Sequence, residues 1–186
     1  MELFISDNQP QDTLSLALEL FCVYVRAPQR EIVNLNVLSP ATLAALKLGD
    51  VPLLIKSVSK PQPDGTVARV EEKLTNPFTM MLEISKAAYL EEILFKKADS
   101  MERTEIGMQV ETADRLKEQE LADYINGLMQ SRMFVVSENI TAADFIVFAA
   151  LAPWFCTLKD HEKLALPNAF RWIDHIQNLP GMLQQV

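Results

Sequence analysis

The sequence predicts a mixed α/β region followed by an all-helical region. Up to residue 75, short apolar or alternating runs take turns with helical patterns, and from residue 76 onward only helical patterns follow. Glycine is scarce, at 5 of 186 residues, which argues against β-barrels and propellers, because their many tight turns need positive φ. We therefore expect two subdomains, residues 1–75 and residues 76–186.

The first region reads as strand, helix, strand, helix, strand, strand. A buried strand and a mostly buried helix come first, and Pro28 ends the helix. A half-buried alternating strand follows, and Ser39-Pro40 combines an N-cap with a first-turn proline. Turn residues at 62–65 then join two strands into a hairpin. In chain order, the predicted strands and helices cover residues 2–6, 14–25, 31–37, a helix from 40, 51–55 and 66–70.

The second region contains several helices that start at recognisable signals. Asn76-Pro77 is again an N-cap with a first-turn proline, and it opens a helical segment at residues 78–97. Residues 102–130 form either one long helix or two helices that break near residues 113–114. A last helix starts at Pro167 and ends at Pro180-Gly181.

The most specific local motif is the segment from Asn139 to Phe145. Thr141 and Asp144 have the spacing of a capping box, in which each side chain bonds the other residue's amide, and Ile140 and Phe145 form a hydrophobic staple. The following helix is apolar almost all round, which predicts a central, buried position. Because a cap explains both polar residues, we interpret Thr141 and Asp144 as structural.

Composition and charge exclude several classes of function. The formal net charge is −8, and so acidic a domain binds nucleic acid poorly, because that affinity comes largely from Lys and Arg. The longest apolar run is too short for a membrane span, and the N-terminus does not look like a signal peptide. With two cysteines and no CxxC motif, a reducing compartment is favoured. We expect a cytoplasmic location.

The cysteines and histidines predict neither redox nor metal chemistry. Cys22 lies in an apolar helix and Cys156 near the end of the buried one, so both are expected to be buried and inert. His161 and His175 are far apart and neither belongs to a metal-binding motif. The sequence therefore predicts no metal site and no cofactor.

The order of these elements resembles the glutathione-transferase fold, a thioredoxin-like half followed by a helical half. Val51-Pro52 is similar to that fold's cis-proline turn, and residues 120–145 resemble its helix, extended link and N-capping box. The ending PNAFRWIDHIQNLPGM resembles the last helix of glutathione-transferase-like domains in the translation machinery. Those domains occur in methionyl- and glutamyl-tRNA synthetases, in multi-synthetase scaffold proteins, and in tRNA-binding cofactors such as yeast Arc1p and the apicomplexan tRNA import protein.

The glutathione-binding residues of an active transferase are only partly matched. Ser6 stands roughly where the thiol-activating residue is needed, and Pro52 where the cysteinyl group would be held. Thr75-Asn76 stands in place of the acid-Ser dipeptide that would bind the γ-glutamyl end. The resemblance therefore implies a vestigial site at Ser6, Pro52, Thr75 and Asn76, with Ser6 an ordinary loop serine and Pro52 a structural turn.

One face of the last helix is the candidate interface. Its core face carries Trp172 and other apolar residues, whereas Phe170, Arg171, Asp174 and Asn178 lie outside it. The spacing alone fits equally a solvated face with an Arg171–Asp174 pair or an interface patch. The resemblance favours the interface, because the arginine before that tryptophan is a partner contact in the synthetase-complex domains.

From the sequence and its resemblance, we predict a non-catalytic domain that docks partners in a multi-aminoacyl-tRNA synthetase complex. Its expected partners are other glutathione-transferase-like domains of synthetases or scaffold proteins, or a second copy of the chain. A tRNA-binding or catalytic region is expected to follow it in a longer protein. The alternatives are an active glutathione transferase, the N-terminal domain of elongation factor 1γ and a plain homodimeric scaffold.

Overall fold

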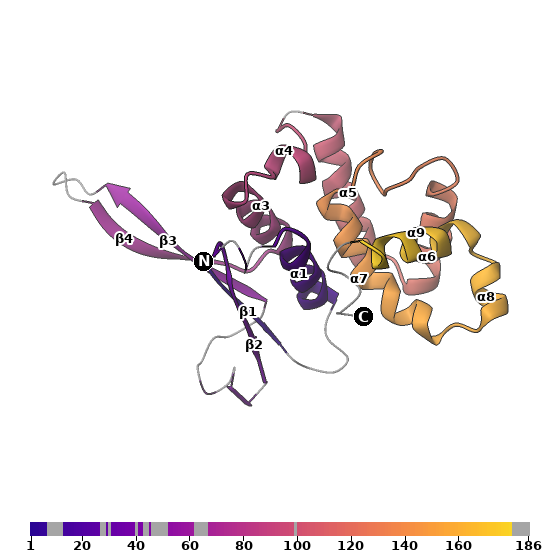
Figure 1. The fold of residues 1–186 in the computed structure, drawn as a ribbon, viewed down its shortest axis with the longest axis horizontal. Helices are drawn as coiled ribbons and strands as arrows, with labels where there is room; N and C mark the ends of the chain where they lie inside the picture. Colours follow the sequence, from indigo (N-terminus) through magenta and orange to yellow (C-terminus); the bar gives the residue numbers. More distant parts are fainter. Residues whose placement is uncertain are drawn as a thin grey trace.

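Figure 1 shows a sheet region on one side of the molecule and a helical region on the other. The computed structural model describes residues 1–6, 13–26, 29, 31–39, 41–42, 45, 52–61, 67–98 and 100–179. The described strands are β1 (Glu2–Ser6), β2 (Asn34–Leu38), β3 (Leu53–Pro61) and β4 (Val67–Leu74). The described helices are α1 (Thr13–Tyr24), α3 (Pro77–Ala87), α4 (Glu91–Leu94), α5 (Met101–Arg115), α6 (Glu118–Leu128), α7 (Ala142–Thr157), α8 (Asp160–Leu164) and α9 (Pro167–Gln177).

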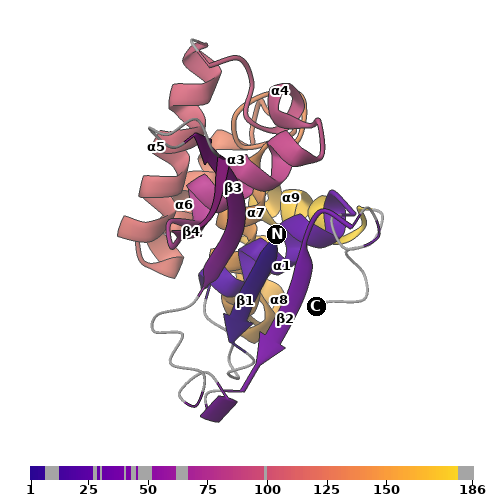
Figure 2. The ribbon, with the colours of Figure 1, turned by 90° about the vertical axis from the view of Figure 1, so that its left-hand side faces the viewer.

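The sheet has the strand order β2-β1-β3-β4. β1 pairs parallel to β2, and antiparallel pairing joins β1 to β3 and β3 to β4. The parallel pair requires a crossover, which the buried helix α1 provides, and Figure 2 shows the strands in front of that helix. This arrangement confirms the thioredoxin-like fold class predicted for the first region.

The second half of the β3–β4 hairpin extends beyond the rest of the sheet. β1 pairs only with Leu53, Leu54 and Ile55 of β3, whereas β3 and β4 stay paired as far as Pro61 and Val67 (Figure 1). At the base of the extension, Lys56 Nζ lies 2.7 Å from Glu83 Oε2 of α3 and 3.2 Å from Glu72 Oε2 of β4. These contacts anchor the hairpin to the first helix after the sheet.

The two regions share one core, and α7 lies at its centre. The helix from Ala142 is apolar on every side, and most of its residues are buried, as the sequence predicts. Phe145 packs edge-on against Phe21 of α1, with ring centroids 5.3 Å apart, and its ring lies 5.1 Å from that of Tyr24. α3 also contacts α1 and β4. The division into residues 1–75 and 76–186 stays a proposal.

Several element boundaries follow the predicted caps. Asn76 Oδ1 accepts from the Thr79 amide at 3.0 Å, and Pro77 occupies the first turn of α3. Ser39 Oγ accepts from the Thr42 amide at 3.3 Å, as an N-cap does. The predicted turn at residues 62–65, the rest of the second predicted helix, and Pro28, Pro180 and Gly181 lie outside the described residues.

Two predicted boundaries were wrong for identifiable reasons. The helical segment predicted at residues 78–97 is interrupted between α3 and α4, because Tyr89 has φ 59°, a left-handed conformation that a helix excludes. The second strand begins at Asn34 rather than residue 31, because Glu31 has φ 56°, a left-handed conformation that a strand excludes.

The helical region 102–130 does divide into two helices, and the break after Arg115 lies close to the predicted residues 113–114. There the Lys117 amide donates to Glu120 Oε2 at 3.4 Å and starts α6, so the break follows the new cap.

Candidate functional site

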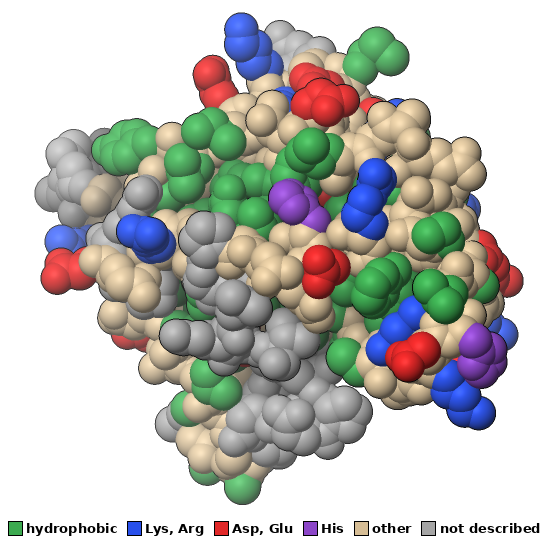
Figure 3. Space-filling model, turned by 45° about the vertical axis from the view of Figure 1, so that its right-hand side comes forward, with side chains coloured by type: hydrophobic (Ala, Val, Ile, Leu, Met, Phe, Trp, Pro, Cys, Tyr) green, Lys and Arg blue, Asp and Glu red, His purple; other side chains and the backbone are tan. Residues whose placement is uncertain are grey.

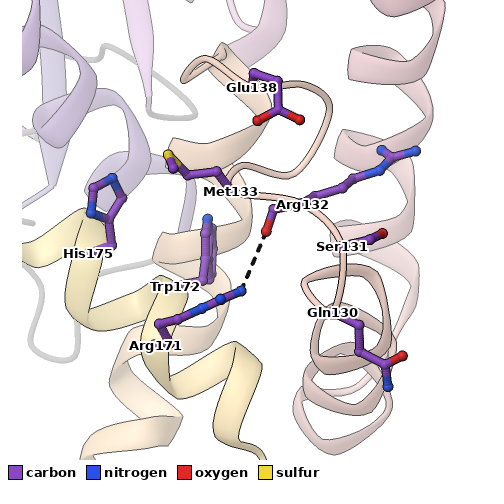
Figure 4. A pocket seen from close by; sticks show the side chains of 8 residues that line it. All are labelled: Gln130, Ser131, Arg132, Met133, Glu138, Arg171, Trp172 and His175. Atoms are coloured by element: carbon purple, nitrogen blue, oxygen red, sulfur yellow. Dashed lines mark hydrogen bonds between the residues drawn. The ribbon is translucent and has the colours of Figure 1, made fainter.

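A hollow of about 430 Å³ lies between α9 and the α6–α7 link, which we define as residues 129–141. Arg171, Trp172 and His175 approach it from α9, and Met133 and Glu138 approach it from the link (Figure 4). The rim of the hollow carries both apolar and cationic side chains. Met133 is 55% exposed there, and Arg132 and Arg171 line the same hollow. The complete lining consists of Gln130, Ser131, Arg132, Met133, Glu138, Arg171, Trp172 and His175.

Arg171 is exposed, but its guanidinium is not free in solvent. Nη2 donates to the Met129 carbonyl at 2.6 Å. It also makes a long contact of 3.5 Å with the Arg132 carbonyl, which the dashed line in Figure 4 marks. Met129 is the C-cap residue of α6, so the arginine satisfies a carbonyl that the helix leaves without a partner. Arg171 therefore stabilises the end of α6 while the rest of its guanidinium faces the hollow.

α6 also supplies a cap for α9. Asn126 Oδ1 accepts from the amides of Asn168 and Ala169 at 2.9 and 3.2 Å, which are two first-turn donors of α9. The two helices thus cap each other, since Asn126 holds the start of α9 and Arg171 holds the end of α6. These two caps fix the position of α9 along its axis relative to α6. They therefore also fix the point at which the Arg171 side chain reaches the surface.

Asp144 is the buried centre of the same region. Its Oδ2 accepts from the Thr141 amide at 2.8 Å, as in the predicted capping box, and also from the Thr141 hydroxyl at 3.0 Å. Its Oδ1 accepts from the Val135 amide at 2.9 Å and from Trp172 Nε1 at 3.2 Å. Burial raises the pKa of the Asp144 carboxyl, while the hydrogen bonds from Val135, Thr141 and Trp172 act in the opposite direction.

The predicted interface residues share one exposed side of α9. The Phe170 ring is 45% exposed, and Arg171, Asp174 and Asn178 are exposed as well. The core face is buried as expected, with Trp172 1% exposed. In the part of the chain that the structure describes, no ion pair joins Arg171 to Asp174. The backbone carbonyls described above hold the guanidinium instead.

The vestigial glutathione positions lie around the sheet. Ser6 ends β1, Pro52 is buried immediately before β3, and Thr75 is exposed after β4. Asn76 Oδ1 accepts from the amide and the hydroxyl of Thr79 at 3.0 and 3.3 Å. The side-chain oxygen of Asn76 is therefore engaged in capping α3.

The cysteines differ from each other in exposure. Cys22 is fully buried, and burial together with the nearby Glu19 carboxylate raises the pKa of its thiol to about 12. The prediction that Cys156 is buried was wrong, because the side chain is exposed near the end of α7. Periodicity could not place it, since an apolar helix gives no sign of which side its last turn leaves uncovered.

The histidines do not come together. His175 packs against Phe134 with ring centroids 5.4 Å apart, and in Figure 3 the two histidines of the chain lie well apart on one face. Across the described ranges, no group of three or more His, Cys, Asp or Glu side chains is placed to hold a metal ion. Within those ranges no helix has the length and hydropathy needed to cross a membrane.

Several residues of this site escaped the sequence analysis. Asn126, Arg132 and Met133 gave no motif, and Asp144 was interpreted only as a cap. Arg132 Nη1 pairs with Glu105 of α5 and also donates to the Val135 carbonyl at 3.1 Å, which holds the link in place. The bonds of Asn126 reach as far as Ala169, 43 positions along the chain. No local sequence pattern could have indicated contacts at such separations.

Comparison with known proteins finds a family model that matches this part of the chain, and relatives named as translation elongation factors. Residues 108–180 match the model of a family described as "Nuclear-export cofactor Arc1p". The chain is 29% identical over 62 residues to eukaryotic translation elongation factor 1 epsilon-1 of Homo sapiens, and 29% identical over 68 residues to that of Mus musculus. These alignments cover 33% and 37% of this chain, and 36% and 39% of the two relatives.

Solved structures match over almost the whole chain. The glutathione-transferase-like domain of elongation factor 1-gamma from Saccharomyces cerevisiae has a TM-score of 0.68 at 14% identity, with 99% of this chain and 91% of that chain covered. Gtt2 from Saccharomyces cerevisiae has a TM-score of 0.69 at 14% identity, with both chains fully covered. The chain has a glutathione-transferase fold. Glutathione transferase E6 from Drosophila melanogaster has a TM-score of 0.68 at 12% identity over 99% of this chain and 90% of that one, so the likeness at these identities shows the fold alone.

Proposed function

We propose that this chain is a non-catalytic domain that binds other proteins of the translation machinery through the exposed side of α9. One observation carries the proposal. The segment similar to the Arc1p family, residues 108–180, contains every residue that lines the hollow and all four predicted interface residues. The partial similarity to translation elongation factor 1 epsilon-1 points to the same cellular process.

The chemistry of this surface suits protein recognition. Arg171 and Met133 offer a guanidinium and a thioether at the hollow, and Phe170 offers an exposed aromatic ring on the same helix as Arg171. Aromatic residues, Met and Arg are enriched in protein interfaces relative to the rest of the surface. Asp174 and Asn178 lie along the same exposed side of α9 and supply polar contacts for the rim of an interface.

We propose partners that carry the same fold. These are glutathione-transferase-like domains of aminoacyl-tRNA synthetases or of their scaffold proteins, as in a multi-synthetase complex, with a homodimer as the alternative. The net charge of −8 favours protein partners over direct contact with tRNA, because phosphate backbones attract basic surfaces. A cytoplasmic location belongs to the same proposal.

The partners are best identified by native mass spectrometry of the tagged chain purified from its source cell. We expect assemblies that contain synthetase or elongation-factor subunits. A parallel purification with Arg171→Ala should lose them, whereas Arg115→Ala should keep them. Arg115 is the matched control, because it is also exposed and ends α5, beside the start of α6 and away from Met129 at the end of α6. Recovery of the chain alone, or of assemblies without translation proteins, would contradict the proposal.

A glutathione-conjugating enzyme is the second candidate. It is favoured by the fold and by a hollow of about 380 Å³ that Thr13 and Leu14 of α1 share with the α5–α6 turn. Against it, Asn76 Oδ1 is engaged in the α3 cap, and Thr75-Asn76 provides no carboxylate at the γ-glutamyl position.

We predict no conjugation of millimolar glutathione to a chlorodinitrobenzene acceptor above the uncatalysed rate. The physical reason is that nothing in the sequence near Ser6 provides the Tyr or Cys that lowers the pKa of a bound thiol, and the thiolate is the nucleophile. The conjugation rate is measured by absorbance, and the rates with and without protein are compared. A strong rate that Ser6→Ala abolishes would establish the enzyme instead.

A further inference from the structure

The two walls of the hollow are tied together by one buried carboxylate. The α6–α7 link forms one wall, and within this link lies Val135, whose buried amide is 2.9 Å from Asp144 Oδ1. The wall from α9 includes Trp172, whose Nε1 lies 3.2 Å from the same oxygen. Asp144 is fully buried, and it takes part in none of the ion pairs among the described residues. Its hydrogen-bond partners are these two donors and Thr141.

Capping of α7 uses only one of the two oxygens of the Asp144 carboxyl group. The bonds that start α7, from the Thr141 amide and hydroxyl, both end on Oδ2. The bonds on Oδ1 reach 9 and 28 residues away along the chain, and a helix cap requires neither of them. The two oxygens therefore serve two purposes that substitutions can separate.

The bond to Trp172 fixes how α9 is rotated about its own axis. The indole packs edge-on against Phe148 of α7, with centroids 6.4 Å apart, and its Nε1–H is held by the carboxylate. Arg171 precedes Trp172 directly, so the rotation that seats the indole also sets the direction of the guanidinium. At that rotation, Nη2 reaches the Met129 carbonyl at 2.6 Å.

We propose that Asp144 is a positioning residue for the α9 surface, because its Oδ1 locks the link and Trp172 together and so holds Arg171 in its binding orientation. This inference rests on the proposed function, in which Arg171 contacts a partner, and it adds the group that sets the geometry. Thr141 holds the other oxygen and has no part in this role.

The test compares two variants that each remove one donor to the carboxylate. Trp172→Phe removes the indole N–H and keeps a buried aromatic ring, whereas Thr141→Ala removes the hydroxyl donor of the cap. Solvent exchange of the Arg171 guanidinium protons is measured by ¹⁵N nuclear magnetic resonance in the unliganded protein, with denaturant added until both variants have equal stability. We expect about fivefold or faster exchange in Trp172→Phe and exchange within about twofold of wild type in Thr141→Ala, because coupled contacts respond together and separate ones do not.

If Trp172→Phe does not fold, a second form of the protein provides the same test. In a Trp154→Phe background, benzothienylalanine in place of Trp172 keeps the two-ring shape and lacks only the N–H, and it should show the same faster exchange. Unchanged Arg171 exchange in the folded form, or an equal change in Thr141→Ala, would overturn the positioning role. The measurement involves no partner, so its failure is distinct from a failure of the proposed function, which the mass spectrometry decides.

Discussion

Phe145→Ala is expected to lower the free energy of unfolding by about 3–5 kcal/mol, the range for emptying a fully buried phenylalanine site. The ring is completely buried and packs against Phe21 and Tyr24 of α1, so it joins the sheet region to the helical region. For a chain of this length, such a loss lowers the melting temperature by roughly 10 °C. Thermal unfolding followed by circular dichroism measures the change.

The matched control is Phe170→Ala, which removes the same ring from a side chain that is 45% exposed on α9. We expect a change within about 0.5–1 kcal/mol, as for other surface substitutions. If both variants lost equal stability, or if Phe145→Ala melted like the wild type, the single core shared by the two regions would be refuted.

Arg171→Ala is expected to weaken association with a partner about thirtyfold, which corresponds to about 2 kcal/mol for a truncated interface arginine. The same change should lower folding stability by about 1 kcal/mol, because the Met129 carbonyl loses its donor at the end of α6. Sedimentation velocity measures association, and circular dichroism measures stability. Substituting an exposed arginine without such a backbone contact would change the folding stability by no more than about 0.5 kcal/mol.

Two neighbouring substitutions separate these effects of Arg171. Asp174→Ala should weaken association less, since the side chain is exposed on the same face and makes no ion pair with Arg171 in the described part of the chain. Asn126→Ala should lower stability by about 1 kcal/mol through the α9 cap without removing a surface contact. Wild-type association by Arg171→Ala would return this face to a solvated helix surface.

Contacts close in sequence were predictable because their signals are local. The Asn76-Pro77 start of α3 and the Thr141–Asp144 box each depend on residues three positions apart, and both are present. Apolar periodicity likewise placed α7 in the core and the buried side of α9 toward it. Errors arose where the chain departs from a repeating pattern, as at Glu31 with its positive φ and at the exposed Cys156.

Local sequence patterns were sufficient to indicate the fold class, the order of the elements and the exposed side of α9, because hydrophobic period and capping chemistry depend on near neighbours. The residues that α9 contacts on other elements are evident only in the folded chain. Arg171 meets the end of α6, Asn126 meets the start of α9, and Trp172 meets Asp144, across separations of 28 to 43 residues. Such pairs exist only once the core has packed, because burial brings the polar groups together and then requires each of them to find a partner.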